Sequence, residues 1–293
     1  RFLEDNRSGA GREVRVDGFR GALSGRATID RLTIADAEGV WLTLENAVLD
    51  WSRAALLSGR VEVNELSAER IALDRLPEPG PAQPPTPEAG VFRLPELPVS
   101  VPIGSLAADS LTLGAPVLGE AAVLTLDGAL SLAGGEGAAR LAGTRTDGRE
   151  GRVTLDAAFS NATGILSLDL ALAEEAGGIA ATLLALPGAP PVSLSVTGDG
   201  PLDDFGAELS LATEGVDRLS GTLRLTGEPA TGTRRFAARI GGDVGPLLAP
   251  AYRGFFGADL RLAADGRRRA DGGIELDALT LDAAGMTVTG ELV

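Results

Sequence analysis

Two pairs of adjacent carboxylates are the residues of this chain best suited to metal binding or acid–base chemistry. Asp203-Asp204 lies in GDGPLDDFG, and Glu174-Glu175 lies in AEEAGG. A calcium ion needs several oxygen ligands that converge on one point, whereas adjacent residues of an extended chain point to opposite faces. We therefore interpret the first pair as part of a turn and the second as the end of a strand. The sequence predicts no metal site.

The composition excludes most other kinds of active site. The chain has no His, no Cys and no Lys, so that all 26 of its basic residues are Arg. These absences exclude a Ser-His-Asp triad, a thiolate or imidazole metal site, and the Lys-containing phosphate-binding loop. No specific catalytic motif remains. We predict that the protein is not an enzyme and uses no cofactor.

The charge of the chain opposes nucleic acid as a partner. The formal net charge is −15, and binding to phosphate backbones depends on clustered basic residues. One basic run, Arg267-Arg268-Arg269, could attract phosphates or lipid headgroups. Asp265 and Asp271 flank this run, which favours a solvated turn.

Alternation of apolar and polar residues is the dominant pattern of the chain. It begins with Val14 and Val16 and returns from residue 99 almost to the carboxyl end, in runs such as ILSLDLALA. A period of two is typical of β-strands with one apolar face. Corners that contain Gly, such as Asp17-Gly18 and Glu38-Gly39, separate the runs, because Gly adopts the positive φ that tight turns require. The sequence predicts a meander of antiparallel strands.

Three segments depart from this alternation and are predicted to be short helices. Residues 52–59, SRAALLSG, begin with Ser and end with Gly, the residues that commonly start and stop a helix. Residues 178–186 and 244–256 space their apolar residues as a helix does. Asp243 is the expected N-cap of the third segment.

A Pro-rich segment divides the chain. Residues 77–90 lack apolar periodicity and are rich in Pro, a composition typical of extended linkers. We therefore predict an amino-terminal β-meander over 1–76 and a continuing sheet over 91–293.

Residues 11–77 carry a resemblance to a known family. VDGFRGALSG, LTIADAEGVWLTL, LDWSRAALLSGRVEV and LSAERI occur in this order, and related pieces such as GDGPLDDFGAELSLATEG continue to the AYRGFFG run. The chain resembles the amino-terminal and central part of the TamB family, the translocation and assembly module subunits of Gram-negative bacteria. This family is similar to AsmA-like and bridge-like lipid transfer proteins.

The resemblance implies a fold, a location and partners. The implied fold is all-β, a long antiparallel sheet curled into a trough with an apolar lining and a few short helices at the rim. The implied location is the periplasm, with an anchor in the inner membrane that lies outside this sequence. The implied partners are phospholipid acyl chains and the outer-membrane barrel TamA, which would contact parts outside this fragment and support outer-membrane protein assembly.

A lipid-carrying groove also agrees with the composition. Aromatic residues make up only 4% of the chain and hydrophobic residues 44%, so aliphatic side chains supply most of the apolar surface. An acyl chain in water exposes methylenes at a cost of about 0.8 kcal/mol each, and an aliphatic groove removes most of this cost. The candidate groove-lining residues are Leu32, Ile34, Leu42, Leu44, Val61, Val63, Leu111, Leu113, Leu124, Leu126, Leu168 and Leu170.

Two other classes of protein are compatible with the strands. A structural or adhesive β-solenoid, like an autotransporter passenger, would form a regular parallel coil without a groove. A carbohydrate-active β-protein would gather Asp, Glu and Arg in one cleft, whereas the charged residues here are spread thinly.

Overall fold

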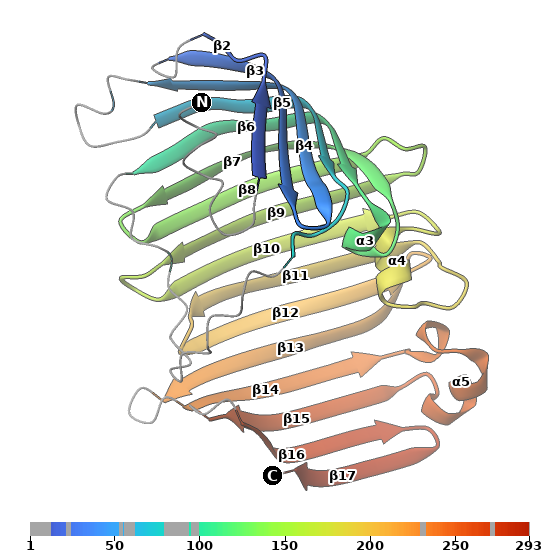
Figure 1. The fold of residues 1–293 in the computed structure, drawn as a ribbon. Coiled ribbons are helices and arrows are strands. Elements are labelled where there is room, and N and C mark those ends of the chain that lie inside the picture. Colours follow the sequence, from blue (N-terminus) through green and yellow to red (C-terminus); the bar gives the residue numbers. More distant parts are fainter. Residues whose placement is uncertain are drawn as a thin grey trace. The chain divides into compact units, whose positions relative to one another are not determined.

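The protein, in a computed structural model, is mostly β-strand; its described residues contain 17 strands that hydrogen-bond into one sheet, and a few short helices (Figure 1). The predicted all-β fold is confirmed. The structure describes residues 13–21, 25–52, 55, 62–78, 94, 100–228, 233–269 and 273–292. The chain divides into two compact units, which we describe separately: unit 1 comprises residues 1–84 and 95–153, and unit 2 comprises residues 85–94 and 154–293.

Unit 1 contains eight strands in the described residues, and each pairs with the next along the chain except that β1 and β2 both pair with β3. The elements are β1 (Glu13–Asp17), β2 (Arg20–Gly21), β3 (Arg26–Asp36), β4 (Gly39–Ser52), β5 (Glu62–Leu73), β6 (Val101–Leu113), α3 (Ala115–Leu118), β7 (Ala122–Ala133) and β8 (Glu136–Arg145). The next strand, β9 (Gly151–Ser160), spans the division between the units.

One strand pair departs from the antiparallel order. β5 and β6 run parallel, with Leu66 opposite Leu106 and Ile71 opposite Leu111. Parallel neighbours require the chain to return to the end of the sheet where the first strand began, and the segment between these strands makes that return. It contains the predicted linker, of which the structure describes only Pro77 and Glu78. Alternation carries no information on strand direction, so the sequence did not predict this exception.

A kink crosses four strands of unit 1 where two polar residues stand in succession. The pairs of polar residues are Asp30-Arg31, Glu45-Asn46, Glu69-Arg70 and Asp109-Ser110. The cross-strand registers skip Asp30, Asn46 and Glu69, and Asn46 has a φ of 51°, a left-handed conformation that Asn adopts more readily than most residues. Asn46 Nδ2 donates to Glu69 Oε2 at 2.6 Å. In β3 the apolar residues are even-numbered after the kink (Leu32 and Ile34) and odd-numbered before it (Ala27 and Ile29).

The residues beside the kink are small and buried. Ala47 lies opposite Ala68, which lies opposite Ala108, and their exposed fractions are 7%, 4% and 3%. Larger side chains would overfill these positions, so the alanines allow β4, β5 and β6 to pack closely beside the kink.

Asp36, at the end of β3, is fixed by Arg75. Arg75 Nη1 donates to Asp36 Oδ2 at 2.9 Å, and Nη2 donates to Oδ1. The backbone N–H groups of Glu38 and Glu78 each donate to the same carboxylate at 3.0 Å. The hydrogen bonds from Arg75, followed by that from Glu78, hold the pKa of Asp36 well below its usual range.

This depressed pKa predicts a pH dependence of stability. A carboxyl group whose pKa is lower in the folded chain stabilises the fold above its unfolded pKa of about 3.9, and this contribution is lost as the pH falls further. We expect Asp36→Asn to lower the urea midpoint at about pH 7, and the difference from wild type to shrink below about pH 4. Urea titrations of both proteins across this range measure the difference. A difference that stays constant with pH would contradict the role of Asp36.

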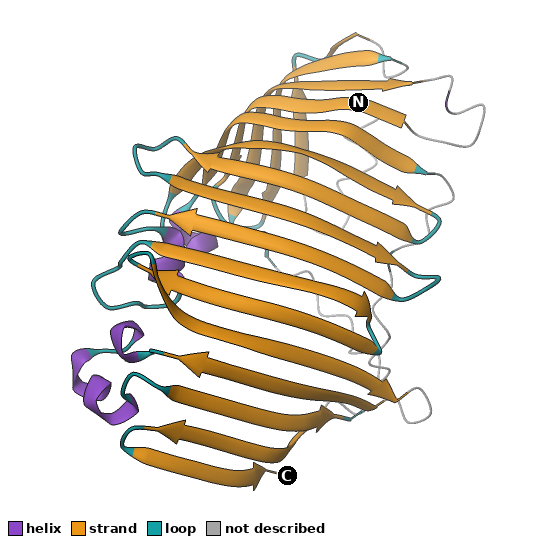
Figure 2. Cartoon of the chain, turned by 180° about the vertical axis from the view of Figure 1, so that it is seen from behind, coloured by secondary structure: helices purple, strands orange, loops and turns teal. Residues whose placement is uncertain are grey.

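Unit 2 is an antiparallel meander in which each strand pairs with the next. Its elements are β10 (Ile165–Glu174), α4 (Ile179–Leu183), β11 (Val192–Pro201), β12 (Asp204–Thr213), β13 (Val216–Glu228), β14 (Thr233–Gly242), the 3-10 turn η1 (Gly245–Leu247), α5 (Pro250–Phe256), β15 (Leu260–Arg268), β16 (Ile274–Ala283) and β17 (Met286–Leu292). Both α4 and α5 lie at the same ends of the strands (Figure 2).

The helices of unit 2 fall where the apolar spacing indicated. α4 lies within 178–186, whereas 244–256 divides into η1 and α5. Pro250 stands at the start of α5, where its missing N–H costs nothing. Asp243 is not the N-cap residue, although its Oδ1 accepts a hydrogen bond from the Gly245 N–H at 3.2 Å. The predicted helix at 52–59 lies outside the described residues, apart from Ser52 in β4 and Ala55.

The described residues contain a small apolar core. It packs α4 against the sheet of unit 2 through Ala180, Ala181, Leu186, Val192 and Leu211. Sixteen hydrophobic residues are buried among those described, and half of them are Ala. Most leucines of the strands are only half-buried. No second layer of the described residues therefore covers them fully.

Candidate functional site

In unit 1, most of the predicted groove residues come together on one face. Residues that lie directly opposite one another in a ladder point to the same face, and the registers define two apolar rows that cross the strands. The first row is Val16, Leu32, Leu44, Ile71, Leu111 and Leu124. The second row is Val14, Ile34, Leu42, Leu73, Leu113 and Ala122.

The other predicted residues of unit 1 lie elsewhere. Leu126 is opposite Ala108, beyond the kink. Val63 is opposite Trp51 and is buried, with 8% of its surface exposed, so it is a core residue. Val61 lies outside the described residues.

Unit 2 carries apolar rows of the same kind, and they include the two remaining predicted residues, Leu168 and Leu170. The first row is Leu168, Gly198, Ala207, Leu223, Ala238, Ala264 and Leu279. The second row is Leu170, Val196, Leu209, Gly221, Ile240, Leu262, Leu281 and Val288. A third, shorter row is Leu172, Leu194, Leu211 and Leu219.

Polar side chains occupy the opposite face of unit 2. Ser195 lies opposite Ser210, and their hydroxyl oxygens are 2.8 Å apart. A hollow of about 810 Å³ lies on this face, and its lining includes Arg239 and Arg261. Arg239 forms two hydrogen bonds with Asp265, and Arg261 pairs with Asp259. Both arginines of the hollow therefore have carboxylate partners within the chain.

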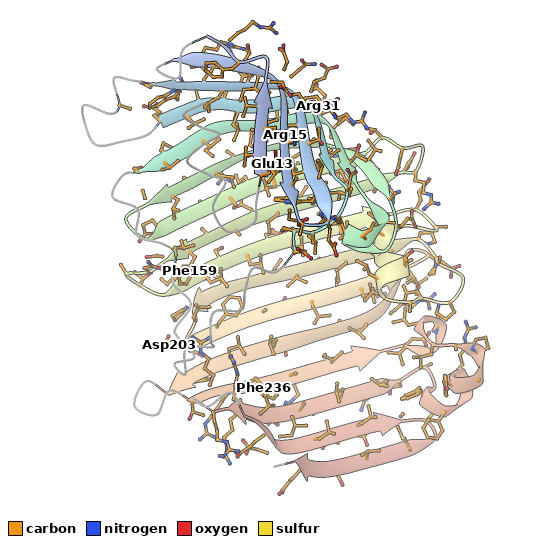
Figure 3. The ribbon with its side chains drawn as sticks, viewed as in Figure 1. Glu13, Arg15, Arg31, Phe159, Asp203 and Phe236 are labelled. Carbon is orange, nitrogen blue, oxygen red and sulfur yellow. The ribbon has the colours of Figure 1, made fainter. Side chains whose placement is uncertain are left out.

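Glycines show which face of unit 2 is crowded. A Cβ added to Gly198 would lie 2.5 Å from the ring of Phe205, and one added to Gly266 would lie 2.5 Å from the ring of Phe236. Figure 3 labels Phe236. Both glycines are on the apolar face, where aromatic rings replace their missing side chains. A Cβ on Gly206, on the polar face, would meet nothing within 4 Å. Aromatic rings therefore fill the space over these two glycines of the apolar face.

The carboxylate pairs form no joint site. Asp203 lies in the turn before β12, where its carbonyl oxygen accepts a hydrogen bond from Gly227 at 2.8 Å, while Asp204 pairs with Arg224 at 2.7 Å. Glu174 ends β10, and its Oε2 accepts a hydrogen bond from the Ala180 N–H at 2.7 Å. In the part of the chain that the structure describes, no group of three or more His, Cys, Asp or Glu is placed to hold a metal ion.

Sequence reasoning missed several residues of the apolar face. Ile71 and Leu73 stand at the centre of the unit 1 rows, and their alternation in ERIAL was a signal that could have found them. Trp41 and Trp51 lie in β4. Their indole N–H groups are buried without a hydrogen-bond partner among the described residues, which no feature of the sequence indicated.

No family model, no curated protein and no solved structure matches the chain. None of the described helices has the length and apolar character needed to cross a membrane. The fold and the registers define an open, mostly antiparallel sheet with an apolar face in each unit.

Proposed function

We propose that this protein binds lipid acyl chains along the apolar faces of its sheet and carries phospholipid between the inner and outer membranes. The observation that carries this proposal is the set of continuous apolar rows in each unit, whose leucines are half-buried except for Leu211, which packs with α4. A filled core would bury these leucines completely, and an ordinary solvated face would be polar. Half-buried aliphatic rows are suited to a ligand that has no polar groups along its length.

The energetics and the dimensions agree with this proposal. A sixteen-carbon tail would cost about 12 kcal/mol to expose in water, at about 0.8 kcal/mol per methylene. Strands lie about 4.8 Å apart, so a row across the six strands of unit 1 extends over about 24 Å. One acyl tail spans about 15 Å, half of the hydrocarbon core of a bilayer. Each row is therefore long enough for a tail.

The resemblance to the TamB family supports the cellular setting that we propose. In this setting the chain is the periplasmic part of a bridge anchored in the inner membrane of a Gram-negative bacterium. The bridge partners TamA through segments outside this sequence, and it supports outer-membrane protein assembly. The antiparallel order of the strands opposes the alternative of a parallel β-solenoid, because only β5 and β6 run parallel among the described pairs.

Lipid loading of the purified chain tests the proposal. The delipidated protein is mixed with vesicles that contain a fluorescent phospholipid and is then separated from them, and the bound lipid is measured. We expect at least one lipid per chain. Protein that remains free of lipid under these conditions, and that contains no phospholipid by mass spectrometry when isolated from cells, would defeat the proposal.

A further inference from the structure

Two arginines lie directly opposite each other near one end of β14 and β15. Arg234 and Arg268 are partners in the register of this strand pair, so their side chains share a face. The register runs without interruption from this pair to Gly242 and Leu260. The face that Arg234 shares is therefore that of Phe236, Ala238 and Ile240, the apolar face of unit 2.

The arginines of the opposite face have carboxylate partners. Arg267 Nε donates to Glu275 Oε2, and Arg269 lies 2.8 Å from Oε1 of the same residue. Glu275 is buried, with 6% of its surface exposed. The predicted solvated turn at Arg267-Arg268-Arg269 is therefore wrong, because Arg267 and Arg268 lie in β15. The outer two arginines share Glu275, Arg267 also lies 3.4 Å from Asp277, and Arg268 shares the other face with Arg234.

Arg234 and Arg268 form no ion pair in the part of the chain that the structure describes. The nearby carboxylate residue is Asp203, which lies against Gly227, the cross-strand neighbour of Arg234. It is not within ion-pair distance of either arginine. Figure 3 labels Asp203 and Phe236 near this end of the strands.

Two like charges at directly opposed positions destabilise a sheet. This arrangement becomes favourable when an anion lies between the charges. Two guanidinium groups can each donate two parallel hydrogen bonds to a phosphate. The apolar face supplies the second requirement of an amphipathic ligand, because Phe236 and Ile240 continue from the arginines along β14.

We propose that Arg234 and Arg268 bind the phosphate group of a lipid whose tails lie on the apolar rows of unit 2. This inference rests on the proposed function and adds the position of the headgroup. The phosphate lies near the strand ends, where water reaches the exposed Arg268, and the tails extend over the half-buried apolar residues. The chemistry recognised is an anionic phosphate group, which belongs either to a lipid headgroup or to a free phosphate ion.

The test compares two double variants of the full chain. Arg234→Gln with Arg268→Gln removes the proposed site, and Arg239→Gln with Arg261→Gln removes the same charge from the polar face of the same two strands. Dissociation constants are measured for phosphatidylglycerol and for diacylglycerol with identical tails. We expect the first variant to bind phosphatidylglycerol at least about tenfold more weakly and diacylglycerol within about twofold of wild type. The control variant should bind both lipids as wild type does.

The possible results of this experiment distinguish the arginine site from the proposed function. Equal binding of phosphatidylglycerol by wild type and the first variant would overturn the arginine site but leave the proposed function intact. Failure of wild type to bind either lipid would defeat the proposed function itself. Titration with inorganic phosphate separates the sources: binding as tight as that of phosphatidylglycerol would show a free-phosphate site and overturn the assignment to a lipid.

A thermal readout distinguishes a ligand site from a structural role. Because the two arginines repel each other when no anion is bound, the first variant should unfold at a higher temperature than wild type in the lipid-free, phosphate-free state. A lower unfolding temperature would show that the pair stabilises the sheet and would overturn the proposal.

Discussion

Replacing Leu42 and Leu124 with Asp is expected to weaken lipid binding by at least about a hundredfold while the sheet stays folded. Each leucine contributes contacts of about 1.5–3 kcal/mol when a tail buries it, and a carboxylate against an acyl chain adds a desolvation cost. Both residues are half-buried and belong to the two apolar rows of unit 1. The measurement is the dissociation constant of a fluorescent phospholipid, with circular dichroism as the test of folding.

Matched controls exist on the same strands. Thr43 and Thr125 are the next residues of β4 and β7, where their cross-strand partners include Thr33 and Thr144. The variants Thr43→Asp and Thr125→Asp place the same charge on the opposite face and should bind lipid as wild type does. Loss of folding in the leucine variants, with normal lipid content before they collapse, would contradict a lipid-facing role.

The largest effect on stability is expected at Phe205. Its ring is 6% exposed and covers Gly198, so Phe205→Ala removes a buried aromatic side chain and uncovers a glycine in a strand. Such truncations cost about 3–5 kcal/mol, and we expect a loss of that size in the free energy of unfolding, measured in urea. The control is Phe255→Ala in α5, where the side chain is exposed at 47% and the loss should stay below about 0.5 kcal/mol. Equal losses at the two positions would show that the ring over Gly198 has no special role.

The sequence predicted strands wherever large aliphatic residues alternate with polar ones. β10, ILSLDLALAE, is such a case. β8, EGAARLAGTR, was missed because its apolar-face positions include Gly137, Ala139 and Gly143, whose small side chains leave little contrast with the polar residues between them. An alternating pattern can be recognised in a sequence only when the apolar residues are large enough to differ clearly from the polar residues between them.

The kink and the Arg234–Arg268 pair depend on cross-strand pairing, which the order of residues in the sequence does not reveal. The pairs of polar residues at the kink, such as Glu45-Asn46, were visible as breaks in alternation, but their alignment across four strands follows only from the registers. The interpretation of Arg267-Arg268-Arg269 as a solvated turn was wrong, because Arg267 and Arg268 lie in β15. The partner of Arg268 across the sheet, Arg234, comes from the preceding strand, and sequence proximity gave no reason to join them.

Photo-crosslinking at neighbouring residues of β12 tests the central claim most directly. Leu209 lies on the apolar face between Val196 and Gly221, whereas Ser210 lies on the polar face. A photoreactive phenylalanine analogue is placed at one position or the other in cells, and the crosslinked products are analysed by mass spectrometry. Our account predicts phospholipid adducts at position 209 and none at position 210. Adducts that are absent at 209, or equally abundant at both positions, would contradict it.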